Sequence, residues 1–154
     1  PFIPVPITAQ TLGVMLAGTV LGARLGGLSL LVFLLLVLAG APVLSGGRGG
    51  LGVIFGPSGG FILSWPISAF VIGLLIEKAL PHLNFIKVLG INILAGILLV
   101  YLIGIPWLAV MTNVSITQAA IGSAIFLPGD LIKAAIVSSF APQLIKRLNL
   151  RKKT

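Results

Sequence analysis

The sequence predicts an all-α, polytopic membrane helix bundle, and three observations carry that prediction. Of the 154 residues, 58% are hydrophobic and only 8% are charged, whereas a soluble domain carries roughly 25% charged residues. The mean hydropathy is +1.23. Apolar runs of the length that crosses a bilayer, about 17 to 25 residues, recur along the chain. We therefore expect residues 1–154 to form a single integral membrane domain.

The apolar runs divide into five expected spans. The first covers about 6–22, where Pro6 suits a helix start because its missing N–H is not needed there. The second covers 26–40 and ends in Gly-Ala-Pro. The others are expected over 60–80, 85–105 and 129–148. Pro66 and Pro142 lie inside the third and fifth spans and can bend them.

Two longer connections separate these spans. The glycine-rich stretch 40–60 holds nine glycines and two prolines, a composition that excludes a continuous helix. The connection 106–128 contains a short helical pattern from Ser115 to Phe126, with Ser115 as its N-cap. This pattern is too short to cross a bilayer, so we expect it to lie at an interface or over a cavity.

Lys and Arg set the expected orientation, because positively charged short loops stay in the cytoplasm. The basic tail places the C-terminus in the cytoplasm. Alternating spans then place eight of the ten basic residues on the cytoplasmic side and two on the outer side. The two outer ones are Arg48 and Lys133. The same count puts Pro1 outside, in the middle of a loop. We therefore expect a further span ahead of it in a longer native sequence.

Several function classes find no support in the residues. The chain has no cysteine and one histidine, His82, so thiol chemistry and a zinc centre are not expected. No Walker A loop or catalytic dyad occurs, and we expect no enzyme, no cofactor and no metal. The formal charge of +8 does not predict nucleic-acid binding, because most basic residues mark the ends of apolar runs rather than one solvated face.

The strongest candidate site is Asp130 with Lys133. Three residues apart at the start of the fifth span, they share one helix face, and Asp130 in the first turn is favoured by the helix dipole. Ionisable groups at membrane depth usually mark a substrate or ion path. The alternative is a capping Asp with a salt-bridged Lys that reaches toward the surface.

Weaker candidates lie in the glycine-rich stretch and at the start of the first span. Arg48 is flanked by glycine pairs, and its planar guanidinium is suited to binding a carboxylate. The alternative is that Arg48 belongs to a surface loop without a ligand. Ser58 and Gly59 precede the third span, where unpaired N–H groups favour an anion. Gln10 either lines the same outer cavity or satisfies the backbone at a helix start.

Five ordered motifs resemble the BioY family, the biotin-binding membrane (S) components of energy-coupling factor (ECF) transporters. They are Pro-Val-Pro-Ile-Thr-Ala-Gln from Pro4, Leu-Gly-Ala-Arg-Leu-Gly-Gly from Leu21, Gly-Gly-Arg-Gly-Gly around Arg48, Gly-Pro-Ser-Gly-Gly-Phe from Gly56, and Leu-Pro-Gly-Asp-Leu-Ile-Lys from Leu127. The family typically has six spans, so the resemblance implies that the first of them is absent here.

The resemblance implies biotin uptake in a prokaryotic plasma membrane, with a coupling transmembrane subunit and ATPase subunits as partners. It places the Asp-x-x-Lys pair in the pocket, which carries over to Asp130 and Lys133. We expect Asp130 to accept the ureido N–H groups, Lys133 to donate to the ligand, and Arg48, helped by the backbone at Ser58 and Gly59, to hold the carboxylate.

Two other functions stay open from the sequence. One is an S component for a different small carboxylated vitamin. The other is a structural membrane subunit without a ligand, in which Asp130 and Lys133 form only a buried ion pair.

Overall fold

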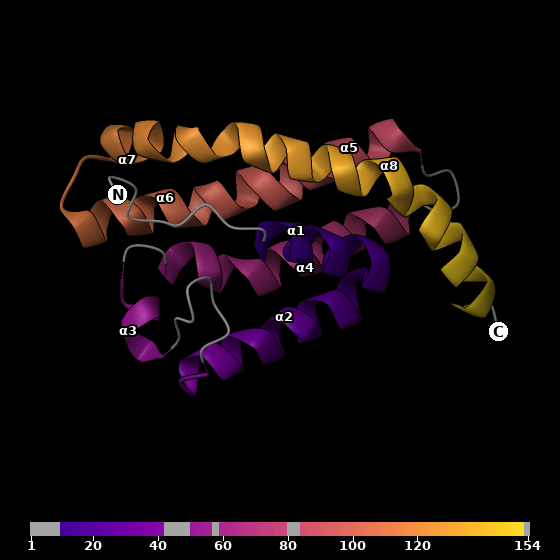
Figure 1. Cartoon of the computed structure of the whole chain (residues 1–154), viewed down its shortest axis with the longest axis horizontal. Coiled ribbons are helices and arrows are strands. Elements are labelled where there is room, and N and C mark those ends of the chain that lie inside the picture. Colours follow the sequence, from indigo (N-terminus) through magenta and orange to yellow (C-terminus); the bar gives the residue numbers. More distant parts are fainter. Residues whose placement is uncertain (1–9, 42–49, 57–58, 80–83, 153–154) are drawn as a thin grey trace.

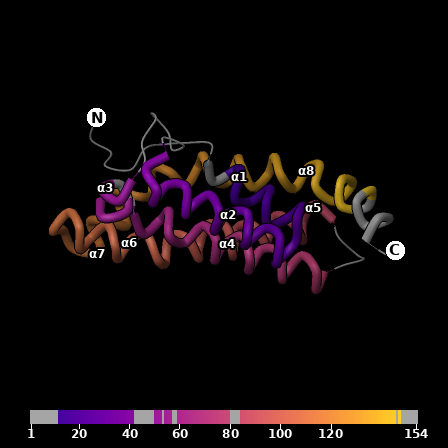
Figure 2. Tube along the Cα trace, turned by 90° about the horizontal axis from the view of Figure 1, so that it is seen from below, coloured from indigo at the N-terminus to yellow at the C-terminus, as the bar shows by residue number. Residues whose placement is uncertain are grey.

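The computed structural model describes residues 10–41, 50–56, 59–79 and 84–152, and they are helical almost throughout. Figure 1 shows the long helices lying along one axis, and Figure 2, turned by 90°, shows the same alignment, so the molecule is an elongated bundle. The elements, in chain order, are α1 Gln10–Leu16, the π-helical η1 Ala17–Leu21, α2 Gly22–Leu38, α3 Leu51–Ile54, α4 Gly59–Ala79, α5 Phe85–Ile91, the π-helical η3 Asn92–Leu98, α6 Leu99–Thr112, α7 Ile116–Ser123, the 3₁₀ turn η4 Ala124–Phe126 and α8 Leu127–Lys152.

Among the described residues, four helices are long and apolar enough to cross a membrane, where the sequence predicted five spans. They are Leu12–Leu38, Gly59–Ala79, Phe85–Thr112 and Ile116–Ile145. The first of these stretches, Leu12–Leu38, covers most of the first two predicted spans, 6–22 and 26–40, because η1 and α2 follow each other directly at Gly22 without an intervening loop. All four are helices, so the predicted fold class is confirmed.

Gly22 nevertheless reverses the chain. Its φ of 87° lies in a region that glycine adopts freely. A Cβ added to Gly26 would lie 2.8 Å from the carbonyl oxygen of Ala17, so α2 runs back along η1. Gly73 of α4 packs on the same turn, where a Cβ would lie 2.2 Å from the backbone nitrogen of Ala23. Small residues thus let three helical segments approach closely.

The predicted boundary at Pro106 is wrong, since α6 continues through this proline to Thr112. A proline inside a membrane helix is tolerated where neighbouring helices pack against that helix, and α4 packs against α6. The helix ends at Asn113, whose φ of 56° is left-handed and whose N–H donates to the Ala109 carbonyl. The expected outer connection 106–128 is therefore mostly helix rather than loop.

Ser115 is the N-cap of α7, as the sequence predicted. Its hydroxyl accepts from the Gln118 N–H at 3.1 Å, and the Gln118 side chain accepts from the Ser115 N–H at 3.4 Å, which completes a capping box. From Ile116 the chain stays helical through η4 into α8. Pro128 is the second residue of α8, which directly follows the 3₁₀ turn η4, and this turn interrupts the α-helical hydrogen-bond pattern there.

Buried polar side chains bond across the bundle interior. Thr19 of η1 and Asn92 of η3 are 1% and 0% exposed, and the Asn92 amide donates to the Thr19 hydroxyl at 3.3 Å. Ser68 of α4 donates to the Ala95 carbonyl at 2.7 Å. A side-chain bond thus joins η1 to η3, and Ser68 satisfies a backbone carbonyl of η3 inside the bundle.

Candidate functional site

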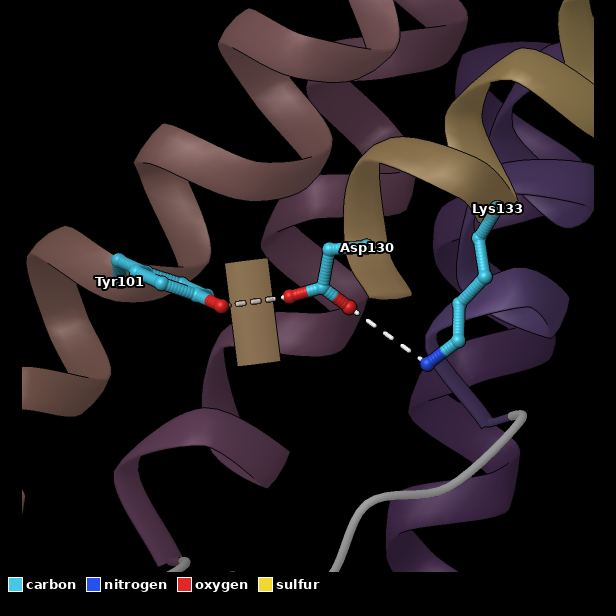
Figure 3. Close-up of polar contacts among 3 residues, drawn as sticks. All are labelled: Tyr101, Asp130 and Lys133. Atoms are coloured by element: carbon cyan, nitrogen blue, oxygen red, sulfur yellow. Dashed lines mark hydrogen bonds and ion pairs between the residues drawn. The ribbon is translucent and has the colours of Figure 1, made fainter. Parts of the chain in front are cut away.

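Asp130 and Lys133 lie together on the first turns of α8, as their spacing predicted. The Lys133 Nζ is 3.5 Å from an oxygen of Asp130, and the side chains are 17% and 8% exposed, respectively. Figure 3 shows the Asp130 carboxylate between Lys133 and a third residue, Tyr101 of α6. The ion pair is thus held inside the protein, where the charges are weakly screened.

Tyr101 is the site residue that the sequence analysis missed. Its hydroxyl donates to the other oxygen of Asp130 at 2.6 Å, a short distance typical of a bond to a carboxylate. Tyr101 is the chain's only tyrosine, and it lies inside an apolar span. A tyrosine inside an apolar span usually finds a polar partner for its hydroxyl. This tendency alone could have marked Tyr101 as a candidate.

The Tyr101 ring is held by α4 and by its own helix. Phe61 packs against it edge-on, with ring centroids 6.1 Å apart and an interplanar angle of 86°. Gly104, one turn further along α6, makes room for Phe61, because a Cβ there would lie 2.4 Å from the Phe61 ring. The hydroxyl of Tyr101 is therefore aimed at Asp130 by packing that does not involve Asp130.

The start of α4 closes against α6 near this aromatic pair. Trp107 donates its indole N–H to the Gly56 carbonyl at 2.8 Å. Gly59 leaves no space for a side chain, since a Cβ would lie 1.7 Å from the Ile54 carbonyl oxygen, and its own N–H donates to Gly56 at 3.2 Å. Gly59 thus serves the packing of α3 on α4, and its N–H already has an acceptor.

Three candidates from the sequence have no described side-chain geometry. Arg48 and Ser58 lie outside the described residues, and Gln10 begins α1 while its side chain lies outside the described part. The structure therefore brings together Asp130 and Lys133 of the predicted set and adds Tyr101. Within the described residues, no group of three or more His, Cys, Asp or Glu could hold a metal ion.

The arrangement offers a defined set of polar contacts in apolar surroundings. A carboxylate oxygen has two lone pairs, so each Asp130 oxygen can accept more than one hydrogen bond. Lys133 supplies three donors. Ligand pockets commonly pair a few such fixed groups with apolar walls. The site suits a small molecule that presents both N–H donors and an acceptor.

The fold and the site define a multi-pass helical membrane protein in which the buried Asp130 meets the half-buried Lys133 and Tyr101. A sequence model of the BioY family matches residues 1–150. The chain belongs to the BioY family.

Named relatives agree with this assignment. The chain is 47% identical to the probable biotin transporter BioY of Bacillus subtilis, over 97% of this chain and 80% of that protein. It is 46% identical to the biotin transporter BioY of Rhizobium etli, over 89% of this chain and 76% of that protein. The crystal structure of an S-component for biotin from an ECF-type ABC transporter superposes with a TM-score of 0.90 at 38% identity, covering 95% of this chain and 78% of that one.

Proposed function

We propose that this protein takes up biotin as the substrate-binding S component of an ECF-type transporter. The observation that carries the proposal is the meeting of Tyr101, Asp130 and Lys133 in one buried site, in a chain that belongs to the BioY family. Relatives at 46% and 47% identity are named biotin transporters. A biotin S-component shares the fold at a TM-score of 0.90.

In this proposal the ureido ring of biotin binds at Asp130. The carboxylate accepts the two ureido N–H groups, and Lys133 donates to an acceptor on the ligand. Tyr101 holds one carboxylate oxygen at 2.6 Å, which fixes the rotamer that the ligand meets. A site built around hydrogen bonds to a ligand's N–H groups discriminates strongly against analogues that lack them. Tyr101 is therefore a positioning residue for Asp130.

The aliphatic tail and carboxylate of biotin are assigned to the glycine-rich side of the site. Arg48 would pair with the carboxylate, with help from the backbone at Ser58, and Gln10 would line the same cavity. The Gly59 N–H donates to the Gly56 carbonyl, so Gly59 is left out of this part of the proposal. A planar guanidinium binds a carboxylate through two parallel hydrogen bonds. This part of the proposal rests on the sequence alone.

Transport requires partners in this scheme. The family resemblance supplies a coupling transmembrane subunit and two ATPase subunits as the energy source. The C-terminus and most basic residues face the cytoplasm, and biotin enters the site from the opposite side.

Thermal unfolding of the purified protein with biotin tests the function. A ligand that binds only the folded state stabilises it by about 4 kcal/mol at a thousandfold excess over Kd. A matched titration with nicotinate and pantothenate, two other carboxylated vitamins, tests the alternative specificity. No shift with any of them, using the full-length protein, would favour the structural-subunit alternative; a shift with another vitamin but not biotin would redirect the substrate.

A further inference from the structure

A groove lies on the lateral surface of the bundle, away from Asp130. It is a groove of about 460 Å³ between α2 and α4, and no residue of α6 or α8 lines it. We call it the α2–α4 groove. Its lining residues are Arg24, Gly27, Leu28, Leu31, Pro66, Ile67 and Phe70.

The α2–α4 groove is apolar and open to the surroundings. From α2, the lining positions follow spacings of three and four, so they share one helix face. Gly27 forms part of its floor, where a Cβ would lie 3.2 Å from the Phe70 Cβ. Leu28, Ile67 and Phe70 are 50%, 49% and 45% exposed. An exposed apolar surface between two membrane-spanning helices is suited to acyl chains.

One charged residue, Arg24, stands at an end of the groove. It is the third residue of α2, and its side chain is exposed. The ion pair found among the described side chains is that of Lys133 with Asp130, and Arg24 takes no part in it. The carboxylate at this turn, Glu77, accepts from the Ala23 backbone N–H at 3.0 Å. The Arg24 guanidinium is thus available to an external anion.

The dimensions fit an amphiphile with an anionic head. Arg24 and Leu31 are seven residues apart on α2, which is about 10 Å along the helix axis. The hydrocarbon half of one leaflet is about 15 Å deep. Figure 1 shows the start of α2 at the same end of the bundle as the C-terminal part of α8. A headgroup at Arg24 therefore lies at the membrane surface while its chain extends inward along the groove.

We propose that the α2–α4 groove binds an anionic phospholipid, with the phosphate on Arg24 and one acyl chain along Leu28, Leu31 and Phe70. Charge complementarity selects the anionic lipid, because the ammonium of a zwitterionic headgroup offsets its phosphate and repels the guanidinium. The apolar lining retains the chain. This inference does not depend on biotin binding at Asp130.

Lipid-dependent thermal stability of the full, detergent-purified protein tests the headgroup. Phosphatidylglycerol is expected to raise the melting temperature more than phosphatidylcholine with the same chains. Arg24→Gln should abolish that difference, and Arg24→Lys should retain most of it. Arg147→Gln, an exposed arginine on α8, is the matched control and should leave the difference intact. If Arg24→Gln preserves the preference, or the wild type has none, the proposal fails.

A second pair of variants tests the chain. Leu28→Gln places a polar group in the groove and should weaken stabilisation by both lipids. Leu35→Gln changes a similarly exposed leucine of α2, 56% exposed, outside the groove and should have no such effect. Soluble glycerol phosphate should not stabilise the wild type, which separates a lipid from a free phosphate. If the groove variants instead reduce only assembly with transporter subunits and leave lipid preference unchanged, the groove binds protein and the lipid assignment is overturned.

Discussion

Asn92 donates its side-chain amide to the Thr19 hydroxyl at 3.3 Å and to the Val88 carbonyl at 3.0 Å, and so joins the two π-helical segments. Both residues are buried, so each side chain needs a polar partner inside the bundle. The pair connects α1–α2 with α5–α6 at the centre of the bundle. Its strength is accessible to a double-mutant cycle.

For that pair, Asn92→Leu and Thr19→Val should each destabilise the protein, and the double variant should lose less than the sum. Interhelical hydrogen bonds in membrane proteins contribute about 0.6 kcal/mol on average. Unfolding in detergent, monitored by helical circular dichroism, measures the coupling free energy. Strict additivity of the two changes would show that the side chains do not interact energetically.

Tyr101→Phe should weaken biotin binding while leaving the fold intact. The change removes the hydroxyl that bonds Asp130 and preserves the ring that packs on Phe61. A hydrogen bond to a charged group contributes about 1.5 to 3 kcal/mol, so a loss of about tenfold or more in affinity is expected. Isothermal titration with biotin measures it. Wild-type affinity in Tyr101→Phe would remove the positioning role.

Asp130→Asn should lower biotin affinity further, because the amide replaces one acceptor oxygen with a donor that meets the ureido N–H groups unfavourably. We expect a loss of about a hundredfold, equivalent to about 2.7 kcal/mol. Lys133→Met, which keeps the apolar stem, should weaken binding less. Glu77→Gln alters the chain's other acid, which still accepts from Ala23 as an amide, and is the matched control. Equal losses in Asp130→Asn and Glu77→Gln would point to a general effect of charge.

Gly73→Ala should destabilise the bundle. The added Cβ would lie 2.2 Å from the Ala23 nitrogen, and backbone atoms cannot move aside as a flexible side chain can. Overpacking of this kind costs about 1 to 3 kcal/mol. Gly90→Ala is the matched helical control, since nothing lies within 4 Å of its Cβ position, and it should be neutral or stabilising. The same assay of unfolding in detergent compares them; a harmless Gly73→Ala would mean that α2 and α4 sit further apart.

Membrane topology is testable because the chain has no cysteine of its own. Single variants Lys87→Cys and Asn113→Cys place thiols near opposite ends of the α5–α6 helix, Phe85–Thr112. In intact cells, an impermeant maleimide should label Asn113→Cys alone, and Lys87→Cys should react only after the membrane is opened. The reverse pattern would invert the orientation predicted from the basic residues.

The sequence predicted those parts of the fold that depend on local pattern. Apolar length identified the helices, the Asp130 to Lys133 spacing placed both side chains on one face, and the Ser115 cap was correct. The sequence predicted wrongly at Pro106, through which α6 continues to Thr112, because one proline does not end a helix that packs in a bundle. Tyr101 was missed because its partner lies twenty-nine residues away on another helix, and nothing local to Tyr101 predicts that contact.

The helical stretch formed by α7, η4 and α8 is longer than the hydrocarbon core of a membrane is thick. The helix Ile116–Ile145 has 30 residues, which is about 45 Å of helix against a hydrocarbon core of about 30 Å. A tilt within the usual range does not absorb this mismatch. If Ile145, followed by basic residues, marks one boundary, the other falls near Phe126, and Asp130 lies only about 6 Å inside the hydrocarbon layer. Neighbouring helices, and not a deep position in the bilayer, then shield Asp130 from water. A solute can therefore reach Asp130 from the aqueous phase without crossing the bilayer interior.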